Sequence, residues 1–257
     1  MPHPRFLPAV TRTLRSAGCV FAESEAELLV DAFVGDDLEH AVAQRILGTP
    51  LEQILGWAEF CGLRIVVEPG VFVPRRRTEL LVRLAATSNP HTVVDICCGS
   101  GAVGTALAHV LDGLELHASD IDTAAVRCAR RNVEPVGGHV YAGDLYASLP
   151  EELRGHVDVI AANAPYVPTD AIGSMPPEAR DHEPRVALDG GVDGLDVQRR
   201  VASDATRWLA PNGRLLIETS VRQAERTAQI VVAAGFDADI VHDDELDGTV
   251  VIGRACR

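Results

Sequence analysis

The sequence lacks the cysteine spacings that hold structural zinc or staple a small secreted scaffold. It has six cysteines among 257 residues, and none form a Cys-x-x-Cys pair. We therefore expect reduced, buried thiols in a cytosolic protein. The six are Cys19, Cys61, Cys97, Cys98, Cys128 and Cys256.

Long apolar runs and a positive charge balance are also missing. No run reaches the roughly 18 residues that a membrane span needs, and the start MPHPRFLPAVTRTLR has no apolar signal core. We expect a cytoplasmic protein without a membrane partner. Lys and Arg number 23 against 37 Asp and Glu, a net charge of -14. Such a surface repels phosphate backbones, so we expect no direct nucleic-acid binding, although a basic protein partner remains possible.

The length suits one large domain with a smaller module. Residues 1–56 are predicted to be a helical domain, because Leu7, Val10 and Leu14 have helical spacing. Residues 57–74 carry alternating and β-branched residues broken by glycines, which predicts a connecting β-hairpin. Residues 75–257 form the predicted main domain.

Strand and helix patterns alternate through that domain, which predicts an α/β fold with a parallel sheet covered by helices on both faces. The last two strands have no helix between them and should form an antiparallel pair at the sheet end. Seven strands with a terminal reversed pair define the Rossmann-like sheet of class I methyltransferases. The expected strands are 92–96, 114–119, 139–143, 157–162, 213–219, 238–242 and 249–255.

The stretch VVDICCGSGAVGTALA runs from a predicted strand into a predicted helix, with Gly99 and Gly101 at the turn. Glycine permits close approach of a ligand to the backbone, and the first N–H groups of a helix are unpaired. With Gly104, these glycines satisfy the dinucleotide pattern. Asp95 before the loop favours a methyl donor instead. The loop alone leaves both ligands open, together with a simple turn that binds nothing.

Two further acids follow strands. Asp120 ends the second predicted strand, where a carboxylate can bind ribose hydroxyls in either cofactor class. Asp144 follows the third strand and can accept from an adenine amino group, while Leu145 packs on the ring. A plain turn aspartate would also explain Asp144. Because the carboxyl ends of parallel strands share one edge, these residues are expected to lie together.

The segment Asn163-Ala164-Pro165-Tyr166 follows the strand VDVIAA. The side-chain oxygen of Asn163 and the carbonyl of Ala164 can accept both hydrogens of an NH2 group. Tyr166 can cover the flat face of that group. Two acceptors on its hydrogens would favour positive charge developing at a weakly nucleophilic amide or aromatic amine nitrogen. The segment therefore predicts transfer to a planar nitrogen, and the plainer alternative is a proline turn.

Over nearly its whole length the sequence resembles the release factor glutamine methyltransferases, which methylate the glutamine of a Gly-Gly-Gln loop. The stretches that carry the resemblance are GTPLEQILGWAEFCGLRIVVEPGVFVPRRRTELLV, DICCGSGAVGTALA, SDIDTAAVRCARRN, GDLY, EPRVALDGGVDGLDVQRR and LLIETSVRQ.

The resemblance implies that S-adenosyl-L-methionine is the donor and that a protein such as a peptide chain release factor is the substrate. It also implies that the N-terminal helices dock that substrate. Implied donor contacts are Cys97, Gly99, Ser100, Gly101, Asp120, Ile121, Asp144, Leu145 and Asn163. Implied contacts to the glutamine amide are Asn163, Ala164, Pro165 and Tyr166, and Arg75, Thr78 and Glu79 are expected where the substrate enters.

Three positions depart from the family pattern. Ala164 replaces the first proline of Asn-Pro-Pro-Tyr, which removes a fixed φ. Arg76 and Arg77 stand where the family has proline and usually an acid, and Ser220 stands where glycine is usual. The arginines indicate either a solvated helix start or an altered substrate with an acidic group. Three hypotheses follow: protein glutamine N-methylation, methylation of another NH2 group on a small molecule or nucleobase, and donor binding without turnover.

Overall fold

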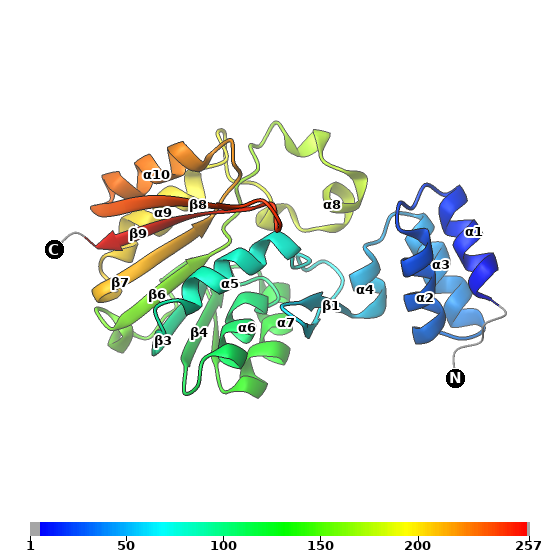
Figure 1. The fold of residues 1–257 in the computed structure, drawn as a ribbon, viewed down its shortest axis with the longest axis horizontal. Helices are drawn as coiled ribbons and strands as arrows, with labels where there is room; N and C mark the ends of the chain where they lie inside the picture. The colour runs from blue at the N-terminus through cyan, green and yellow to red at the C-terminus, as the bar shows by residue number, and fades with distance from the viewer. Residues whose placement is uncertain (1–5, 256–257) are drawn as a thin grey trace.

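The computed structural model describes residues 6–255, and its N-terminal part is helical. Helices α1 (Leu7–Ser16), α2 (Ala22–Ala32), α3 (Asp36–Ile46) and α4 (Leu51–Leu55) lie at one end of the long axis (Figure 1). They pack around a core of their own that includes Leu14, Leu29 and Leu38. Burial of this apolar stripe stabilises helices that are too short to persist alone.

A short antiparallel hairpin follows, formed by β1 (Trp57–Phe60) and β2 (Leu63–Val66). Cys61 and Gly62 make its turn with positive φ angles of 50° and 73°. The predicted hairpin was longer, but the chain from Val67 onward leaves the strand conformation. The side chains of Val67, Val71 and Val73 are buried there nonetheless. The division into domains at residues 56 and 74 stays a prediction.

The described residues of the main part form a seven-stranded sheet in the order β5-β4-β3-β6-β7-β9-β8. The strands are β3 (Thr92–Ile96), β4 (Glu115–Asp120), β5 (His139–Ala142), β6 (Val157–Ala162), β7 (Leu209–Glu218), β8 (Phe236–Asp243) and β9 (Gly248–Ala255). Strands β3 to β7 pair in parallel, whereas β9 is antiparallel to both β7 and β8. The predicted α/β class I methyltransferase sheet with its reversed terminal pair is thereby confirmed.

Helices cover both faces of the sheet. A short 3-10 helix, η1 (Arg76–Thr78), leads into α5 (Glu79–Ala86), which lies with α6 (Ala102–Val110) and α7 (Thr123–Val133) on one face. The other face carries α9 (Asp196–Ala205) and α10 (Ala224–Ala233). Successive residues of β6 alternate between the two cores, with Val159 in one and Ile160 in the other. This period of two, with both faces apolar, is what a buried parallel strand requires.

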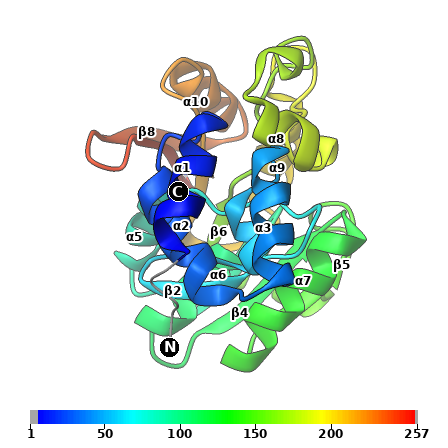
Figure 2. The ribbon, with the colours of Figure 1, turned by 90° about the vertical axis from the view of Figure 1, so that its right-hand side faces the viewer.

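An insert between Ala162 and Asp196 carries α8 (Pro177–His182) and the 3-10 helices η4 (Ile172–Ser174) and η5 (Arg185–Ala187). It reaches the N-terminal helices: Arg45 Nη1 at the end of α3 lies 3.4 Å from Glu178 Oε1 in α8. Figure 2 shows α8 beside the end of α3. The insert therefore contacts the N-terminal helices.

The thiols agree only in part with expectation. In residues 6–255 the cysteines are free thiols, of which Cys98 and Cys128 are buried. The other three are half-buried, because each lies at an element end where packing is incomplete; they are Cys19, Cys61 and Cys97. Cys256 lies outside the described residues. A bilayer-spanning helix, long and apolar enough for that role, does not occur between residues 6 and 255.

Candidate active site

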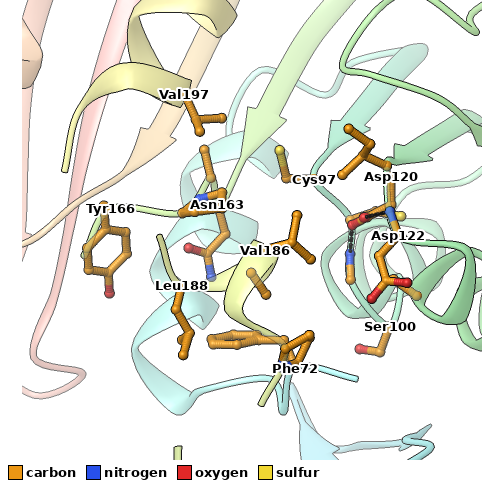
Figure 3. Close-up of a pocket in the computed structure, with 18 of the residues that line it drawn as sticks. Phe72, Cys97, Ser100, Asp120, Asp122, Asn163, Tyr166, Val186, Leu188 and Val197 are labelled. Carbon is orange, nitrogen blue, oxygen red and sulfur yellow. Dashed lines mark hydrogen bonds between the residues drawn. The ribbon is translucent and has the colours of Figure 1, made fainter. Parts of the chain in front are cut away.

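A cavity of about 280 Å³ opens at the carboxyl ends of β3, β4 and β6. Figure 3 shows Cys97, Ser100, Asp120 and Asp122 toward one end of it, and Asn163 with Tyr166 toward the other. Of the predicted site residues, those lining it are Arg75, Thr78, Cys97, Gly99, Ser100, Asp120, Ile121, Asp144, Leu145, Asn163, Ala164, Pro165 and Tyr166. Segments far apart in sequence thus meet at one sheet edge.

Two predicted residues are not part of the lining. Gly101 instead starts α6 with φ 75°, and a Cβ there would meet Val133 Cγ2 of α7 at 2.7 Å. It permits close packing of the two helices. Glu79 faces the hairpin, where Oε1 accepts a 3.2 Å hydrogen bond from the Cys61 N–H. Its place at the start of α5 connects the hairpin turn to that helix.

The glycine loop is held by Asp120. The Gly99 N–H donates to Asp120 Oδ2 at 2.8 Å, and the Asp122 N–H donates to Oδ1 at 2.9 Å. Burial raises the pKa of Asp120, while these backbone hydrogen bonds oppose that rise. A carboxylate so fixed at the cavity wall is oriented before any ligand arrives.

Asp95 lies beneath the loop and is almost fully buried. Its Oδ2 accepts a hydrogen bond from the Gly104 N–H at 3.0 Å. Burial raises the pKa of Asp95 to about 7, against the opposing effect of that hydrogen bond. The third glycine of the loop pattern is thus used for a contact to Asp95, and a Cβ there would meet Leu116 Cδ1 at 2.9 Å.

Asp144 and Leu145 line the same end of the cavity as Asp120. Leu145 has φ 52°, and its carbonyl accepts a 2.9 Å hydrogen bond from Ser119 Oγ. Asp144 Oδ2 is paired at 2.6 Å with Nη2 of Arg200 from α9. Sequence reasoning missed Arg200, because only the fold brings this residue of α9 to the loop after β5.

At the other end, the Asn163 side chain is fixed from behind. Its Nδ2 donates to Thr78 Oγ1 at 3.3 Å. The Tyr166 carbonyl accepts from Gln223 Nε2 at 2.9 Å. Burial, helped by the Glu218 charge, raises the pKa of the Tyr166 hydroxyl, so this phenol remains protonated at neutral pH.

Residues 188–194 of the insert, here called the strap, support the backbone of this segment. The Val167 N–H donates to the Leu188 carbonyl at 3.0 Å, and the Gly190 N–H donates to the Val167 carbonyl at 2.9 Å. A Cβ on Gly190 would meet the Pro165 carbonyl oxygen at 2.7 Å. The glycines of the strap therefore allow it to pack directly on the Asn-Ala-Pro-Tyr backbone.

The three consecutive arginines separate. Arg75 Nη2 lies 2.5 Å from Oε1 of the buried Glu183, and Arg77 Nε lies 3.5 Å from Oε1 of the buried Glu218. Both arginines line the cavity. Arg76 points to the surface, where Glu245 is 3.8 Å away. Of the three arginines, only Arg76 is the solvent-exposed residue expected at a helix start.

Glu183 and Glu218 were not predicted as part of the site. A carboxylate inside an otherwise apolar strand end, as in LLIETS, is the signal that could have indicated Glu218. Apolar side chains complete the cavity on this side, namely Phe72, Met175, Val186 and Leu188. Within residues 6–255 there is no group of three or more His, Cys, Asp or Glu that could hold a metal ion.

The sequence is similar to those of known proteins. A family profile described as methyltransferase small domain matches residues 62–175. A release factor glutamine methyltransferase of Geobacter sulfurreducens is 39% identical over 218 residues, covering 83% of this chain and 76% of that protein. The chain belongs to the release factor glutamine methyltransferase family.

A similar protein is named for a different acceptor. A 4-amino-L-phenylalanine/4-methylamino-L-phenylalanine methyltransferase of Streptomyces pristinaespiralis is 34% identical, covering 88% of this chain and 80% of that protein. A solved methyltransferase structure from Pyrococcus furiosus superposes with a TM-score of 0.58 at 15% identity, over 84% of this chain and 98% of that one. That likeness concerns the fold alone.

Proposed function

We propose that this protein transfers a methyl group from S-adenosyl-L-methionine to the side-chain amide nitrogen of a glutamine in a protein, within a Gly-Gly-Gln loop. The observation that carries the proposal is that Asn163 and Tyr166 line the same cavity as Gly99 and Asp120. A donor at one end of this cavity would meet an acceptor nitrogen at the other.

The lining of the donor end fits this cofactor. That lining includes four acidic residues, Asp95, Asp120, Asp122 and Asp144, of which Asp144 is paired with Arg200. Negative charge favours a cation and disfavours the pyrophosphate of a dinucleotide. When bound, S-adenosyl-L-methionine supplies a methyl group on positively charged sulfur.

In this proposal the other lining residues of the donor end have distinct roles. Asp120 would accept from the ribose hydroxyls, and Asp144 would accept from the adenine amino group, against which Leu145 packs. The remaining contacts would come from Cys97, Gly99, Ser100, Ile121 and Asn163, while Gly101 would support the loop from the start of α6.

The acceptor end suits a planar NH2 group. Asn163 Oδ1 and the Ala164 carbonyl would each accept one amide hydrogen, and Tyr166 would cover the amide plane. Transfer of the methyl group would make the nitrogen positive, because its lone pair would form the new N–C bond while the C–S bond of the donor broke and left its electron pair on sulfur. The two oxygens favour that charge, and the nitrogen then releases one proton to solvent. Fixing the nitrogen in line with the methyl group contributes through orientation.

We also propose that residues 1–56 form a docking domain for the protein substrate, joined by the hairpin at 57–74 to the transferase domain at 75–257. The salt bridge between Arg45 and Glu178 supports this assignment, because it connects the helices to the insert that borders the acceptor end. Arg75 and Thr78 would guide the glutamine-bearing loop inward, with Glu79 supporting them from the start of α5.

A second candidate is transfer to the amine of a small aromatic acid. The 34% identical relative named for 4-amino-L-phenylalanine favours it, as do two arginines and apolar side chains at the acceptor end. An arylamine also has a planar, delocalised nitrogen, and an arginine could pair with its carboxylate.

The test is methyl transfer to purified acceptors. The protein is incubated with donor labelled in the methyl group and with a folded release factor, and the modified residue is located by mass spectrometry. We expect one methyl on the Gly-Gly-Gln glutamine and none in the Asn163→Ala variant, which should still bind donor by calorimetry. Transfer to 4-amino-L-phenylalanine but not to the release factor would favour the second candidate. No transfer to either would contradict both.

A further inference from the structure

We propose that Thr78 and Glu218 are positioning residues that fix which way the Asn163 amide points. The inference rests on the proposed function, because it concerns the oxygen that would accept from the NH2 group of the substrate. It adds two residues, from η1 and from the end of β7, to a site otherwise built from the loops after β3 to β6.

The first step is the contact behind Asn163. Its Nδ2 lies 3.3 Å from Thr78 Oγ1, and Thr78 is buried. A hydroxyl both donates and accepts. Whether Thr78 accepts from the Asn163 amide or donates to it depends on where the Thr78 proton goes.

The second step is the acceptor for that proton. Glu218 is 1% exposed, and within the described residues neither of its carboxylate oxygens has a hydrogen bond of normal geometry. Burial raises the pKa of Glu218, and the nearby Thr78 hydroxyl is the foremost of the groups that lower it, ahead of the Arg77 charge. A buried carboxylate short of donors requires an explanation, and the hydroxyl of Thr78 is the neutral side-chain group that interacts with it.

The third step follows from counting protons. If Thr78 donates its single proton toward Glu218, the hydroxyl can only accept from Asn163. The NH2 half of the Asn163 amide must then face Thr78, and Oδ1 must face the cavity. The reversed amide would present two N–H donors to the N–H donors of the substrate, which would repel it. The carboxylate thus selects the productive orientation through one hydroxyl.

Arg77 favours the charged form of this carboxylate and so opposes the effect of burial. Its Nε lies 3.5 Å from Glu218 Oε1, and its guanidinium also borders Tyr166. The positive charge favours the ionised form of Glu218, which accepts a hydrogen bond and does not donate one. Arg77 therefore supports the acceptor end of the cavity through Glu218 and Tyr166.

The kinetic test compares Thr78→Val, which keeps the shape without the hydroxyl, with Thr78→Ser, which keeps the hydroxyl. We expect Thr78→Val to lower kcat about 10- to 100-fold, less than removal of a direct transition-state contact, with donor Kd and acceptor KM changed less than about threefold. Thr78→Ser should recover most of kcat. Glu218→Leu, which removes the acceptor for the Thr78 proton, should resemble Thr78→Val.

The matched control is Thr105→Val in α6. Thr105 is buried, its hydroxyl has no hydrogen-bond partner among the described residues, and it does not line the cavity. Its replacement should leave kcat unchanged. A Thr78→Val enzyme with kcat within twofold of the wild type would overturn the inference.

A second measurement does not depend on turnover. In ¹⁵N-labelled protein, the Asn163 side-chain NH2 signals are assigned by their loss in Asn163→Ala. We expect their hydrogen exchange to be slowed in the wild type and in Thr78→Ser, and to be fast in Thr78→Val. Equal exchange in all three would reject the orientation. If the wild type methylates no acceptor, the proposed function fails, and this measurement still decides the orientation.

Discussion

At the scale of single residues, burial changes how the carboxylates of the donor end hold protons. The pKa of Asp95 is raised to about 7 and that of Asp120 is raised as well, both mainly by burial. Asp95 is therefore mostly ionised at pH 8 and mostly protonated at pH 6. Near neutral pH, the charge of this end depends on pH.

We predict that affinity for the sulfonium donor falls from pH 8 to pH 6 by about fivefold, equivalent to about 1 kcal/mol of lost attraction. The sign follows because protonation removes negative charge that faces a cation. Calorimetry at pH 6, 7 and 8 measures it. S-adenosylhomocysteine, whose sulfur is uncharged, should show a smaller change, and Asp95→Asn should flatten the response. Equal pH dependence for both ligands would contradict the role of charge.

The residues that the sequence predicts well are those fixed by local chemistry. Asp120, Asp144 and Asn163 follow strands, and strand ends of a parallel sheet meet at one edge whatever the details. Glu218 and Arg200 could not be predicted in the same way, because their roles depend on which helix crosses which strand end. Arg76 and Arg77 are adjacent in sequence, yet one is paired at the surface and the other borders the cavity.

At the scale of elements, the parallel strands were predictable to within a few residues, since buried strands are apolar runs bounded by turns. Strand β7 starts earlier than predicted, at Leu209, because it continues through Pro211-Asn212-Gly213 with a register shift opposite β6. Helix α8 and the 3-10 helices of the insert were missed. They are too short to show a helical period, and the insert is held by contacts to distant segments.

The strap offers the sharpest test at this scale. A Cβ on Gly190 would collide with the carbonyl oxygens of Gly194 and Pro165 at 2.5 and 2.7 Å. We predict that Gly190→Ala shifts the Asn-Ala-Pro-Tyr backbone and lowers kcat at least tenfold, because a displacement of about 1 Å can cost about 10²-fold, while donor affinity changes little.

Gly173→Ala is its matched control. Gly173 lies in the same insert, a Cβ there would meet nothing within 4 Å, and its φ is not in the left-handed region. This variant should keep wild-type kcat and melting temperature. If both variants lose turnover to the same degree, any substitution in the insert is harmful. The packing of the strap on the Asn-Ala-Pro-Tyr backbone would then not explain the effect of Gly190→Ala.

At the scale of the whole molecule, one arginine connects the parts. Arg45 pairs with Glu25 through two hydrogen bonds of 2.7 and 3.1 Å, and it also faces Glu178 in α8. Both members of the Arg45–Glu25 pair are nearly buried. Removing the arginine would leave Glu25 as an unpaired buried charge.

We predict that Arg45→Ala destabilises the protein by about 3 kcal/mol, measured by urea unfolding. Arg207→Ala, which removes an exposed partner of Asp204, should change stability by less than about 0.5 kcal/mol. Similar effects of the two substitutions would mean that the buried pair contributes little. If part of the helical signal is lost at a lower urea concentration than the rest, the N-terminal helices unfold separately from the sheet.

The donor end and the acceptor end differ in how the chain supplies them. Residues 95–145 provide nearly all of the former as one continuous stretch, whereas the latter needs Thr78, Asn163, Glu183 and Glu218 to converge from four separate segments. In evolution such a division lets one half stay constant while substitutions in the other accumulate. The acceptor can then change while donor binding is kept. A substitution at Arg77, which borders the acceptor end, would alter the choice of acceptor before it altered donor binding.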